Sequence, residues 1–474
     1  MLSQQKQTKL ISFVKHIFTP TQNQLILFAA LLITNLTTSC TQQIESIAPQ
    51  ETPTSIVIEE PKVVNVTITV DAIDVKAFGA KGDGQADDTE AITKALKSGA
   101  GKQVLFPEGT YKVTKVIKLE VSNIEIAGLG KSKILSTERT IIDLGNVSNV
   151  SFKNLSFEST NTNAATYYFG LMASNRKTIS GLSVSGCTFS APNCSTAGIK
   201  LVTDAVGSSV KNISINNCTF NNIGNMAIEI QNHLYDGIDR FSQIEVSSCT
   251  FSNLGLNENA AYHYGMAVSF SGKGSNLIVA DNRISNPYDI GIELAGSIKN
   301  AQIVRNQLSE LTRMNKEANR PLSVISISSS KGDMHENIQI IANQNLNKDD
   351  KAYIFFGNVT SATVENNKFN TMWFMQLRNV SNSTFKNNQI SSRGGNALLI
   401  ESTNLSSQNN QFLNSTFSCD GNSSAEAVVK FKGSQTNKNT IVKSQLIRST
   451  NKTVYLKETD SASKNELQNC TFNS

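Results

Sequence analysis

This chain of 474 residues has little charge, few aromatic residues and few prolines. Only 17% of its residues are Asp, Glu, Lys or Arg, and it holds 8 prolines, one tryptophan and four histidines. Disordered chains normally carry a high charge, so the low charged fraction argues against disorder. The formal net charge is only +5 and no Lys/Arg cluster is visible, so the sequence does not indicate a nucleic-acid partner. Neutral polar residues mixed with Val, Ile and Phe are instead typical of many short strands.

The first forty residues are organised like an export signal. Three lysines precede the apolar run Leu25–Leu36, small residues then lead to Cys40, and the segment contains no Asp or Glu. The apolar run is too short to span a membrane comfortably. The residues before Cys40 are similar to a lipoprotein cleavage box, although Thr37 stands where Leu is usual. We therefore expect export with lipidation of Cys40; a soluble exported protein with an incidental cysteine is the alternative.

A repeat of about 20 to 40 residues runs through the rest of the chain. VSGCTF, INNCTF and VSSCTF place Cys187, Cys218 and Cys249 at equal spacing, and LQNCTF follows near the C-terminus at Cys470. Elsewhere the same frame holds a small polar residue: Asn282, Asn306, Asn367, Asn388 and Ser444.

Repeats of this kind predict a solenoid, because a single unit cannot bury its own apolar face. Short strands and a stacked small polar position favour an all-β, single-stranded right-handed parallel β-helix with a short N-terminal capping helix. Asn side chains at the stacked position would bond to one another along the stack. We expect the cysteines of this frame to be buried thiols; a disulfide between adjacent rungs is the alternative.

A second frame gives one core strand per unit, beginning with IIDL and GLMA and ending with TVYL. If the second and fourth residues of each strand point inward, the third points outward. About twelve rungs then form an outward column: Asp143, Met172, Lys200, Glu229, Ser269, Glu293, Ser326, Phe355, Gln376, Leu399, Lys430 and Tyr455.

The stretch FGAKGDG…DDTEAI…AL, followed by VLFPEGTYKV, is the most family-specific part of the chain. It resembles the N-terminal signature of the pectate-lyase-like β-helix superfamily, and more narrowly its rhamnogalacturonase, polygalacturonase and epimerase-like domains. The resemblance implies a right-handed parallel β-helix and enzymes that mostly cleave polysaccharides. The motifs GHG, DPH and WxDH of its better-known enzymes are missing. The resemblance therefore transfers no catalytic residue.

The same stretch also predicts a structural cap. Gly79, Gly82 and Gly84 permit turns with positive φ, and Asp87 followed by Glu90 has the spacing of a capping box. The apolar residues that follow share one helical face, which would cover the open end of the solenoid. A phosphate-binding loop is excluded because GxxxxGK[ST] is absent and the acids would repel phosphate.

The candidate active site lies in the units between residues 200 and 300. The interval from Glu229 to Ser269 is the longest in the outward column, so extra loops would form walls there. Glu229 and Glu293 lie two rungs apart, roughly 9 to 10 Å at the backbone. Carboxyl groups about 6.5–9.5 Å apart leave room for a water molecule, as an inverting glycosidase requires. Glu229, Glu293 and Asp289 are therefore the catalytic candidates, whereas the later rungs of the column appear chemically quiet.

Substrate-binding candidates come from the column and from its loops. Lys200 and Arg240 could bind the carboxylate of an acidic sugar. Loop histidines and tyrosines could bond to or stack on sugar rings: His233, Tyr235, Tyr262, His263, Tyr264 and Tyr288. The structural alternatives are an ion pair between Lys200 and Glu229 on a solvated face, loop hydrogen bonds for the histidines, and a turn role for Asp289.

Three functions remain open. The first is a glycoside hydrolase acting on an acidic or complex polysaccharide, with no cofactor. The second is a polysaccharide lyase with Lys200, Tyr264 or His263 as base and with calcium as a possible ligand. The third is a non-catalytic glycan-binding protein or adhesin. No Cys/His spacing predicts a metal site.

The expected organisation is a signal segment over residues 1–40, a flexible tether over 41–66 with three prolines, and one β-helix domain over 67–474. We expect a monomer, with a trimer as the alternative, and contact with a membrane only through the lipid anchor. The expected location is the outer membrane or cell surface, the periplasm or the medium.

Overall fold

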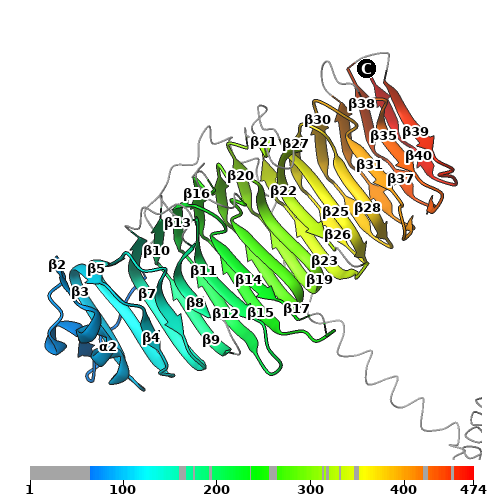
Figure 1. Ribbon diagram of the computed structural model, residues 1–474. Helices are drawn as coiled ribbons and strands as arrows, with labels where there is room; N and C mark the ends of the chain where they lie inside the picture. Colours follow the sequence, from blue (N-terminus) through cyan, green and yellow to red (C-terminus); the bar gives the residue numbers. More distant parts are fainter. Residues whose placement is uncertain are drawn as a thin grey trace, which may run out of the picture. The chain divides into compact units, whose positions relative to one another are not determined.

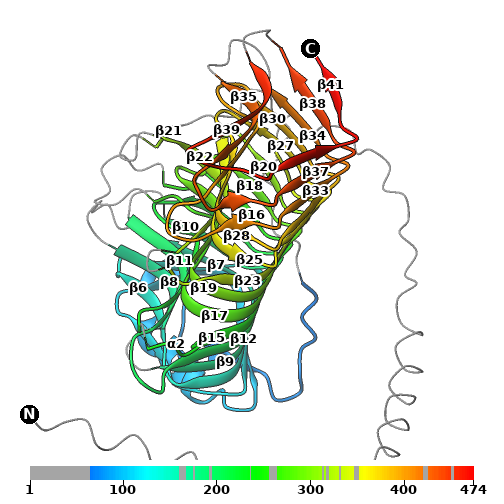
Figure 2. The same ribbon diagram turned by 90° about the vertical axis from the view of Figure 1, so that its right-hand side faces the viewer.

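The computed structural model describes residues 64–474 except for 160–166, 174–176, 192–194, 235, 256–263, 312–313, 316–319, 330–331, 346–351, 420–424 and 450–452. Nearly all of its strands pair in parallel with the strand at the same place in the next unit. Figures 1 and 2 show these units stacked in sequence order along one axis, from blue to red. The expected fold, an all-β parallel β-helix with one short capping helix, is confirmed.

Three faces surround the core, and each turn of the chain contributes one strand to each face. The first face contains β4 (Ile117–Leu119), β6 (Thr140–Leu144), β8 (Tyr167–Ala173), β11 (Ser195–Thr203), β14 (Ile228–Asn232), β17 (Val268–Ala280), β19 (Ile290–Val304), β22 (Arg320–Ser328), β25 (Ala352–Thr360), β28 (Met375–Ser381), β31 (Leu398–Glu401), β35 (Ala427–Lys432) and β39 (Val454–Thr459). The long strands β17 and β19 continue around the corner into the second face.

The second face contains β9 (Thr178–Ser185), β12 (Ser209–Asn216), β15 (Phe241–Ser247), β23 (His335–Ile341), β26 (Thr363–Glu365), β29 (Thr384–Lys386), β33 (Gln411–Leu413), β37 (Thr440–Val442) and β40 (Glu466–Gln468). The third face contains β10 (Thr188–Ala191), β13 (Thr219–Ile223), β16 (Thr250–Ser252), β18 (Arg283–Ser285), β20 (Gln307–Ser309), β24 (Gln344–Asn345), β27 (Lys368–Thr371), β30 (Gln389–Ser392), β34 (Thr416–Cys419), β38 (Gln445–Arg448) and β41 (Thr471–Asn473). Three long strands near the N-terminus cover both of these faces: β3 (Gln103–Val113), β5 (Ile124–Ser136) and β7 (Val147–Ser159).

Short elements complete the fold. β1 (Ile73–Asp74) and β2 (Asp83–Asp87) pair with β3, and β32 (Ser407–Gln408) pairs with β36 (Thr436–Asn437). β21 (Met314–Asn315) pairs antiparallel with β22.

The glycine-rich stretch forms the entrance to the β-helix. The 3-10 helix η1 (Val75–Phe78) ends at Gly79, and Gly79, Gly82 and Gly84 have φ angles of 101°, 65° and 76°. Helix α2 (Thr89–Lys97) follows, and its apolar face is buried against the first rung. This confirms the predicted cap, since the helix covers the core with residues that alternate at helical spacing.

The acidic residues of this stretch have a different role from the one predicted. Asp88 occupies the N-cap position, but its carboxylate accepts the backbone N–H groups of Lys81 and Gly82 at 2.6 and 3.0 Å and makes no cap bond. The capping-box prediction for Asp87 is therefore wrong. Asp87 accepts from Thr89 and Thr114; partial burial alone would raise its pKa, but these hydrogen bonds lower the pKa of Asp87 to about 2. The acids thus fix the glycine loop to the helix.

The stacked polar position forms one continuous interior ladder. Cys187, Cys218 and Cys249 are buried free thiols, which confirms their predicted role. The Cys249 N–H donates to the Oδ1 of Asn282 at 2.9 Å, and the ladder continues through asparagines and serines: Asn282, Asn306, Asn343, Asn367, Asn388, Ser415 and Ser444.

Asn306 shows how each member of this ladder is bonded. Its Oδ1 accepts the backbone and side-chain N–H groups of Asn282 at 3.1 and 2.9 Å. Its Nδ2 donates to the carbonyl of Val279 at 2.8 Å and to the Oδ1 of Asn343 at 2.9 Å. Asn306 is fully buried, so the ladder satisfies backbone groups that water cannot reach.

His335 is also fully buried, at the start of β23. The backbone N–H of Ile298 donates to its Nδ1 at 3.2 Å, and its Nε2 lies 2.9 Å from the carbonyl of Ser328. This pattern requires the neutral ring with the proton on Nε2. Burial lowers the pKa of His335 to about 4.

Candidate functional site

The outward column of the first face runs along the strands in an unbroken register. Its thirteen stacked positions are Lys118, Asp143, Met172, Lys200, Glu229, Ser269, Glu293, Ser326, Phe355, Gln376, Leu399, Lys430 and Lys457. The prediction of Tyr455 for the last position was wrong. Lys430 pairs with Lys457 because Val429 pairs with Leu456, which places the last strand two residues further along than the predicted frame.

Glu229, Ser269 and Glu293 are consecutive partners in this column, on β14, β17 and β19. Two rungs of about 4.8 Å separate the two glutamates at the backbone, as the repeats predicted. The hydroxyl of Ser269 donates to Oε2 of Glu293 at 2.6 Å, and Ser269 itself is 1% exposed. A buried serine therefore orients the Glu293 carboxylate.

A chain of polar contacts extends from Glu229 in both directions. Lys200 on β11 forms an ion pair with Oε2 of Glu229 at 2.7 Å. On β14 itself, the amide of Gln231 donates to Oε1 of Glu229, and the Oε1 of Gln231 lies 2.6 Å from Nε2 of the exposed His233. Glu229 is only 5% exposed, so both of its oxygens are engaged by protein donors in a largely closed setting.

Three other predicted residues meet just before the strand that carries Glu293. The N–H of Tyr288 donates to the carbonyl of Gly265 at 3.1 Å, next to Tyr264, which is 43% exposed. Asp289 directly precedes β19, is 4% exposed, and accepts the backbone N–H of Ser323 through its carbonyl at 2.9 Å. Gly265 has a φ of 47°, and a Cβ there would lie 2.4 Å from the Cβ of Tyr288, so this approach requires glycine.

The remaining predicted residues lie elsewhere. Arg240 is 4% exposed and pairs with Asp236 of the same loop after β14; this hydrogen bond lowers the pKa of Asp236. Tyr235, Tyr262, His263 and the lipidation candidate Cys40 lie outside the described residues.

Sequence reasoning missed several polar residues because it followed only one residue per strand. Residues two positions further along a strand share its outward side, and Gln231 is such a neighbour of Glu229. The same offset on β28 and β31 gives Arg378 and Glu401. The prediction of Phe355, Gln376 and Leu399 for the later rungs of the column is confirmed, but it overlooked the charged pair two positions further along the same strands. Extending the two-residue alternation of each strand by one further outward position would have identified Gln231, Arg378 and Glu401.

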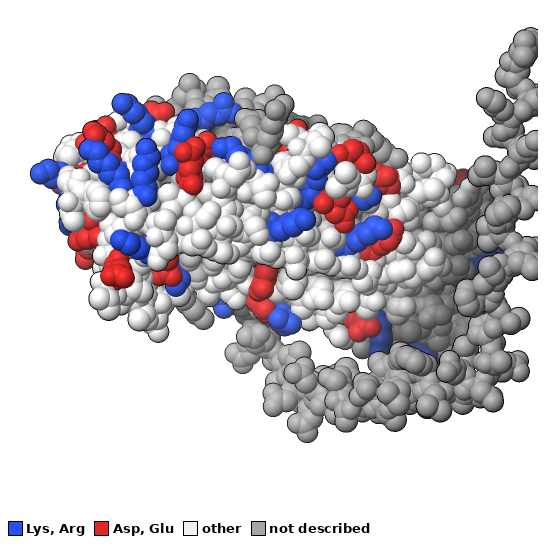
Figure 3. Space-filling view, turned by 90° about the horizontal axis from the view of Figure 1, so that it is seen from below, with Lys and Arg blue, Asp and Glu red and all other residues white. Residues whose placement is uncertain are grey.

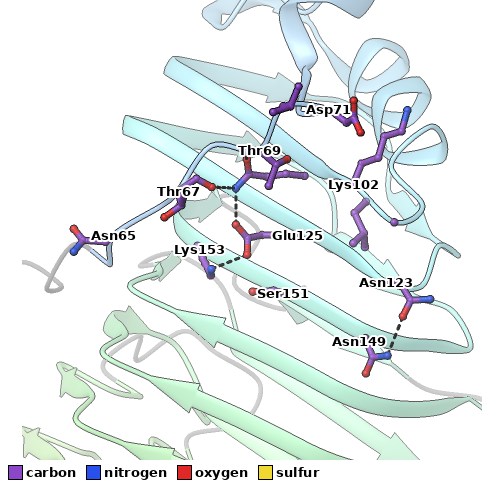
Figure 4. Close-up of a pocket in the computed structure, with 14 residues that line it drawn as sticks. Asn65, Thr67, Thr69, Asp71, Lys102, Asn123, Glu125, Asn149, Ser151 and Lys153 are labelled. Atoms are coloured by element: carbon purple, nitrogen blue, oxygen red, sulfur yellow. Dashed lines mark hydrogen bonds and ion pairs between the residues drawn. The ribbon is translucent and has the colours of Figure 1, made fainter.

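Two pockets lie away from this column, near the N-terminal end. The first, of about 560 Å³, lies between the segment 64–71 and the outer side of β3, β5 and β7 (Figure 4). There the amide of Gln103 donates to the carbonyl of Thr67 and to Glu125 at 3.1 and 2.7 Å, and Lys153 pairs with Glu125 at 2.6 Å. The second pocket, of about 820 Å³, adjoins Val64–Val66 and the third face. These contacts attach the entering segment to the first rungs.

Charges of both signs are interspersed over the surface seen from below (Figure 3), and wide stretches carry none. No single-sign field covers this side of the molecule. Among the described residues, no helix is long and apolar enough to cross a membrane, and no cluster of three or more His, Cys, Asp and Glu side chains could hold a metal ion.

Residues 72–293 match the family described as rhamnogalacturonase A/epimerase, pectate lyase-like. This part of the chain is a pectate lyase-like β-helix domain. It contains the cap, the cysteine ladder and the column from Lys118 to Glu293, which is the last matched residue. The same stacking continues beyond the matched segment to β41.

Known proteins similar to this chain differ in their names. A protein of Arthroderma benhamiae named "Probable glucan endo-1,3-beta-glucosidase" is 40% identical over 75 residues, which are 16% of this chain and 8% of that protein. The mannuronan C-5 epimerase AlgE6 A-module of Azotobacter vinelandii has a TM-score of 0.51 at 15% identity, covering 84% of this chain and 99% of the module. PfbA, a surface adhesin of Streptococcus pneumoniae, has a TM-score of 0.53 at 18% identity, covering 76% and 92%.

The likenesses to solved structures support the fold, which occurs in an epimerase module and in an adhesin alike. This chain matches less than a tenth of the length of the curated relatives named here. Its activity must therefore be argued from its own residues.

Proposed function

We propose that the protein binds an acidic or complex polysaccharide along its first face and hydrolyses it with Glu293 as acid and Glu229 as base. The observation that supports this proposal is the register that stacks Glu229, Ser269 and Glu293 in one outward column. A backbone separation of two rungs is compatible with carboxyl groups about 6.5–9.5 Å apart, which suits a water molecule between the attacked sugar carbon and the base.

The surroundings of the two carboxylates support different roles for them. Glu293 is the less buried of the two, so it can reach the glycosidic oxygen of a bound chain, and the hydrogen bond from Ser269 orients it. Glu229 accepts from Lys200 and Gln231, which fix its oxygens as acceptors for the proton of a water molecule. His233, at the exposed end of this chain of contacts, would hydrogen-bond to the sugar.

A second candidate function is non-catalytic glycan binding. The near-complete burial of Glu229 and its ion pair with Lys200 favour it, because a base must be reachable by water. Lyase cleavage is less well supported, since Lys200, its candidate base, is engaged by Glu229. Under any of these functions we propose an exported protein, attached to a membrane by a lipid at Cys40.

The proposal is tested by incubating the purified full-length chain with a panel of acidic and neutral polysaccharides. Release of reducing ends without the ultraviolet absorbance of an unsaturated uronate indicates hydrolysis; both signals together indicate a lyase. Glu229→Gln and Glu293→Gln should each lower hydrolysis at least a hundredfold. Glu245→Gln, an outward glutamate of β15 on the second face, is the matched control and should leave it unchanged.

Three results would contradict the proposal: full activity of both glutamine variants, the absorbance of an unsaturated product, or binding of a polysaccharide without any release of reducing ends. The last result would favour the glycan-binding function.

A further inference from the structure

A group of aromatic and charged residues lies on the first face beyond the matched domain. We call it the Trp373 patch: Tyr353, Phe355, Trp373, Arg378 and Glu401. Tyr353 and Phe355 are outward residues of β25, Trp373 lies two residues before the start of β28, and Arg378 and Glu401 are partners on β28 and β31. Figure 1 shows β25, β28 and β31 side by side in the yellow and orange part of the molecule.

The patch holds an arginine in a fixed orientation. Nε of Arg378 donates to Oε1 of Glu401 at 2.6 Å, and the Gln376 amide donates to the same oxygen at 2.6 Å. The guanidinium lies over the Phe355 ring, 5.3 Å from its centroid. A Cβ on Gly357 would lie 2.8 Å from this ring, so glycine provides the space in which the ring lies beneath Arg378.

The arginine remains available to a ligand. Its side chain is 42% exposed, whereas that of Glu401 is 9% exposed. Only Nε has a hydrogen-bond acceptor among the described residues, so the two terminal nitrogens can donate to a planar anion. A guanidinium whose terminal nitrogens are unoccupied binds a carboxylate through two parallel hydrogen bonds.

Further aromatic rings lie towards the start of β25 and β28. The Trp373 ring is 6.1 Å from that of Tyr353 and 6.0 Å from that of Phe374, and all three side chains are partly exposed. A Cβ on Gly395 would lie 2.7 Å from the carbonyl oxygen of Trp373, so the backbone of the next turn packs directly against the backbone of Trp373. Partly exposed and rigidly held rings can stack on the C–H faces of sugar rings at little entropic cost.

The charge around the patch favours an acidic ligand. Lys430 and Lys432 of β35 pair in register with Leu399 and Glu401 of the neighbouring strand. Lys430 and Lys457 share the carboxylate of Glu426, at 2.8 and 3.0 Å. Four cations, Arg378 and the three lysines, therefore accompany the two carboxylates of Glu401 and Glu426, which leaves a positive excess on the strands from β28 to β39.

The patch lies on the same column as the two glutamates. Ser326, Phe355 and Gln376 follow Glu293 in consecutive rungs, so Gln376 is about 14 Å from Glu293 along the axis. An oligosaccharide bound along the first face can reach both places at once.

We infer that the Trp373 patch is a binding region for an acidic oligosaccharide, in which Arg378 binds the carboxylate of one sugar unit while Trp373 stacks on the ring of another. The inference rests on the proposed function in placing a polysaccharide on this face, but it requires no catalysis.

Trp373 provides a direct readout because it is the only tryptophan of the chain. The experiment titrates the full-length protein with oligogalacturonate and oligomannuronate, and with the carboxyl-reduced neutral form of each, while tryptophan fluorescence is recorded. At least one acidic oligosaccharide should change the fluorescence saturably, and its reduced form should bind about tenfold or more weakly.

Arg378→Gln should weaken the acidic ligand by a similar factor and leave the reduced ligand unaffected. The matched control is Arg305→Gln, since Arg305 also pairs with a carboxylate, that of Asp281, but lies at the corner that follows the second face. Trp373→Leu, measured by calorimetric titration, should weaken both forms. Thermal unfolding of each variant separates lost binding from lost folding.

The outcomes distinguish the binding region from the proposed function. Unchanged fluorescence with every probe, while reducing ends are still released, would overturn the binding region and leave the proposed hydrolysis standing. Saturable, Arg378-dependent fluorescence without reducing ends would support the binding region and contradict the hydrolysis. Equal binding of acidic and reduced forms would overturn the assignment of an acidic sugar.

Discussion

Replacing Ser269 by alanine removes the hydrogen bond that its hydroxyl donates to Glu293 at 2.6 Å. A hydrogen bond to a charged group contributes about 1.5–3 kcal/mol. Because this donor favours the ionised carboxylate, its loss should let Glu293 hold its proton to a higher pH. The free energy of the lost bond corresponds to about a tenfold or larger change in the protonation equilibrium.

If Glu293 is the catalytic acid, activity falls at the pH where it loses its proton. The alkaline limb of the kcat/KM profile should therefore move to higher pH in Ser269→Ala. Ser271→Ala, at the next outward position of β17, is the control and should leave the limb in place. A carbon-13 NMR titration of the labelled carboxyl follows the same ionisation without a substrate. Coincident alkaline limbs in the wild type and Ser269→Ala would refute the role of Glu293 as acid.

Three further predictions concern other parts of the fold. Asn306→Ala leaves buried backbone groups without partners and should lower the free energy of unfolding in urea by about 3–5 kcal/mol; the partly exposed Asn216→Ala should cost under about 1 kcal/mol, and equal losses would contradict the ladder's role. Burial lowers the pKa of His335 from 6.5 to about 4, so the folded state resists protonation of this ring. The free energy of unfolding should therefore fall by about 3 kcal/mol as the pH drops from above 6.5 to 4. His335→Gln should lose this pH dependence, and an unchanged slope of stability against pH would exclude His335 as its source. Lys200→Met removes the ion-pair partner of the nearly buried Glu229 carboxylate and should destabilise the protein by about 2–4 kcal/mol at pH 7. The double variant with Glu229→Leu should recover most of this loss in thermal unfolding. No recovery would show that the ion pair is not the cause.

The repeats predicted the fold because a solenoid requires the same chemistry at the same place in every unit. Cys187 and its successors stack inside the corner, and the register from Asp143 to Lys430 follows the strand frame. The frame failed only at Tyr455, because β35 and β39 pair with Lys457 opposite Lys430. Tyr455 and Lys457 are two residues apart and share one side of the strand, so alternation alone cannot decide between them.

The candidate site was predicted less completely. Stacking brought Lys200, Glu229, Ser269 and Glu293 together, since those contacts follow from the register alone. Arg240 instead pairs with Asp236 within one loop, and loop geometry is not fixed by the repeat. The acids beside the glycine turns likewise looked like a helix cap, but Asp88 binds the loop amides because the turns present two N–H groups to it.

The most direct test of the paired-carboxylate account is the stereochemistry of hydrolysis. A substrate selected by the polysaccharide panel is cleaved, and the anomeric configuration of the first product is measured by proton NMR before it equilibrates. Carboxylates two rungs apart predict inversion, since water attacks from the face opposite the leaving group. A retained configuration would require a pair only about 5 Å apart and would contradict the assignment of Glu229 and Glu293.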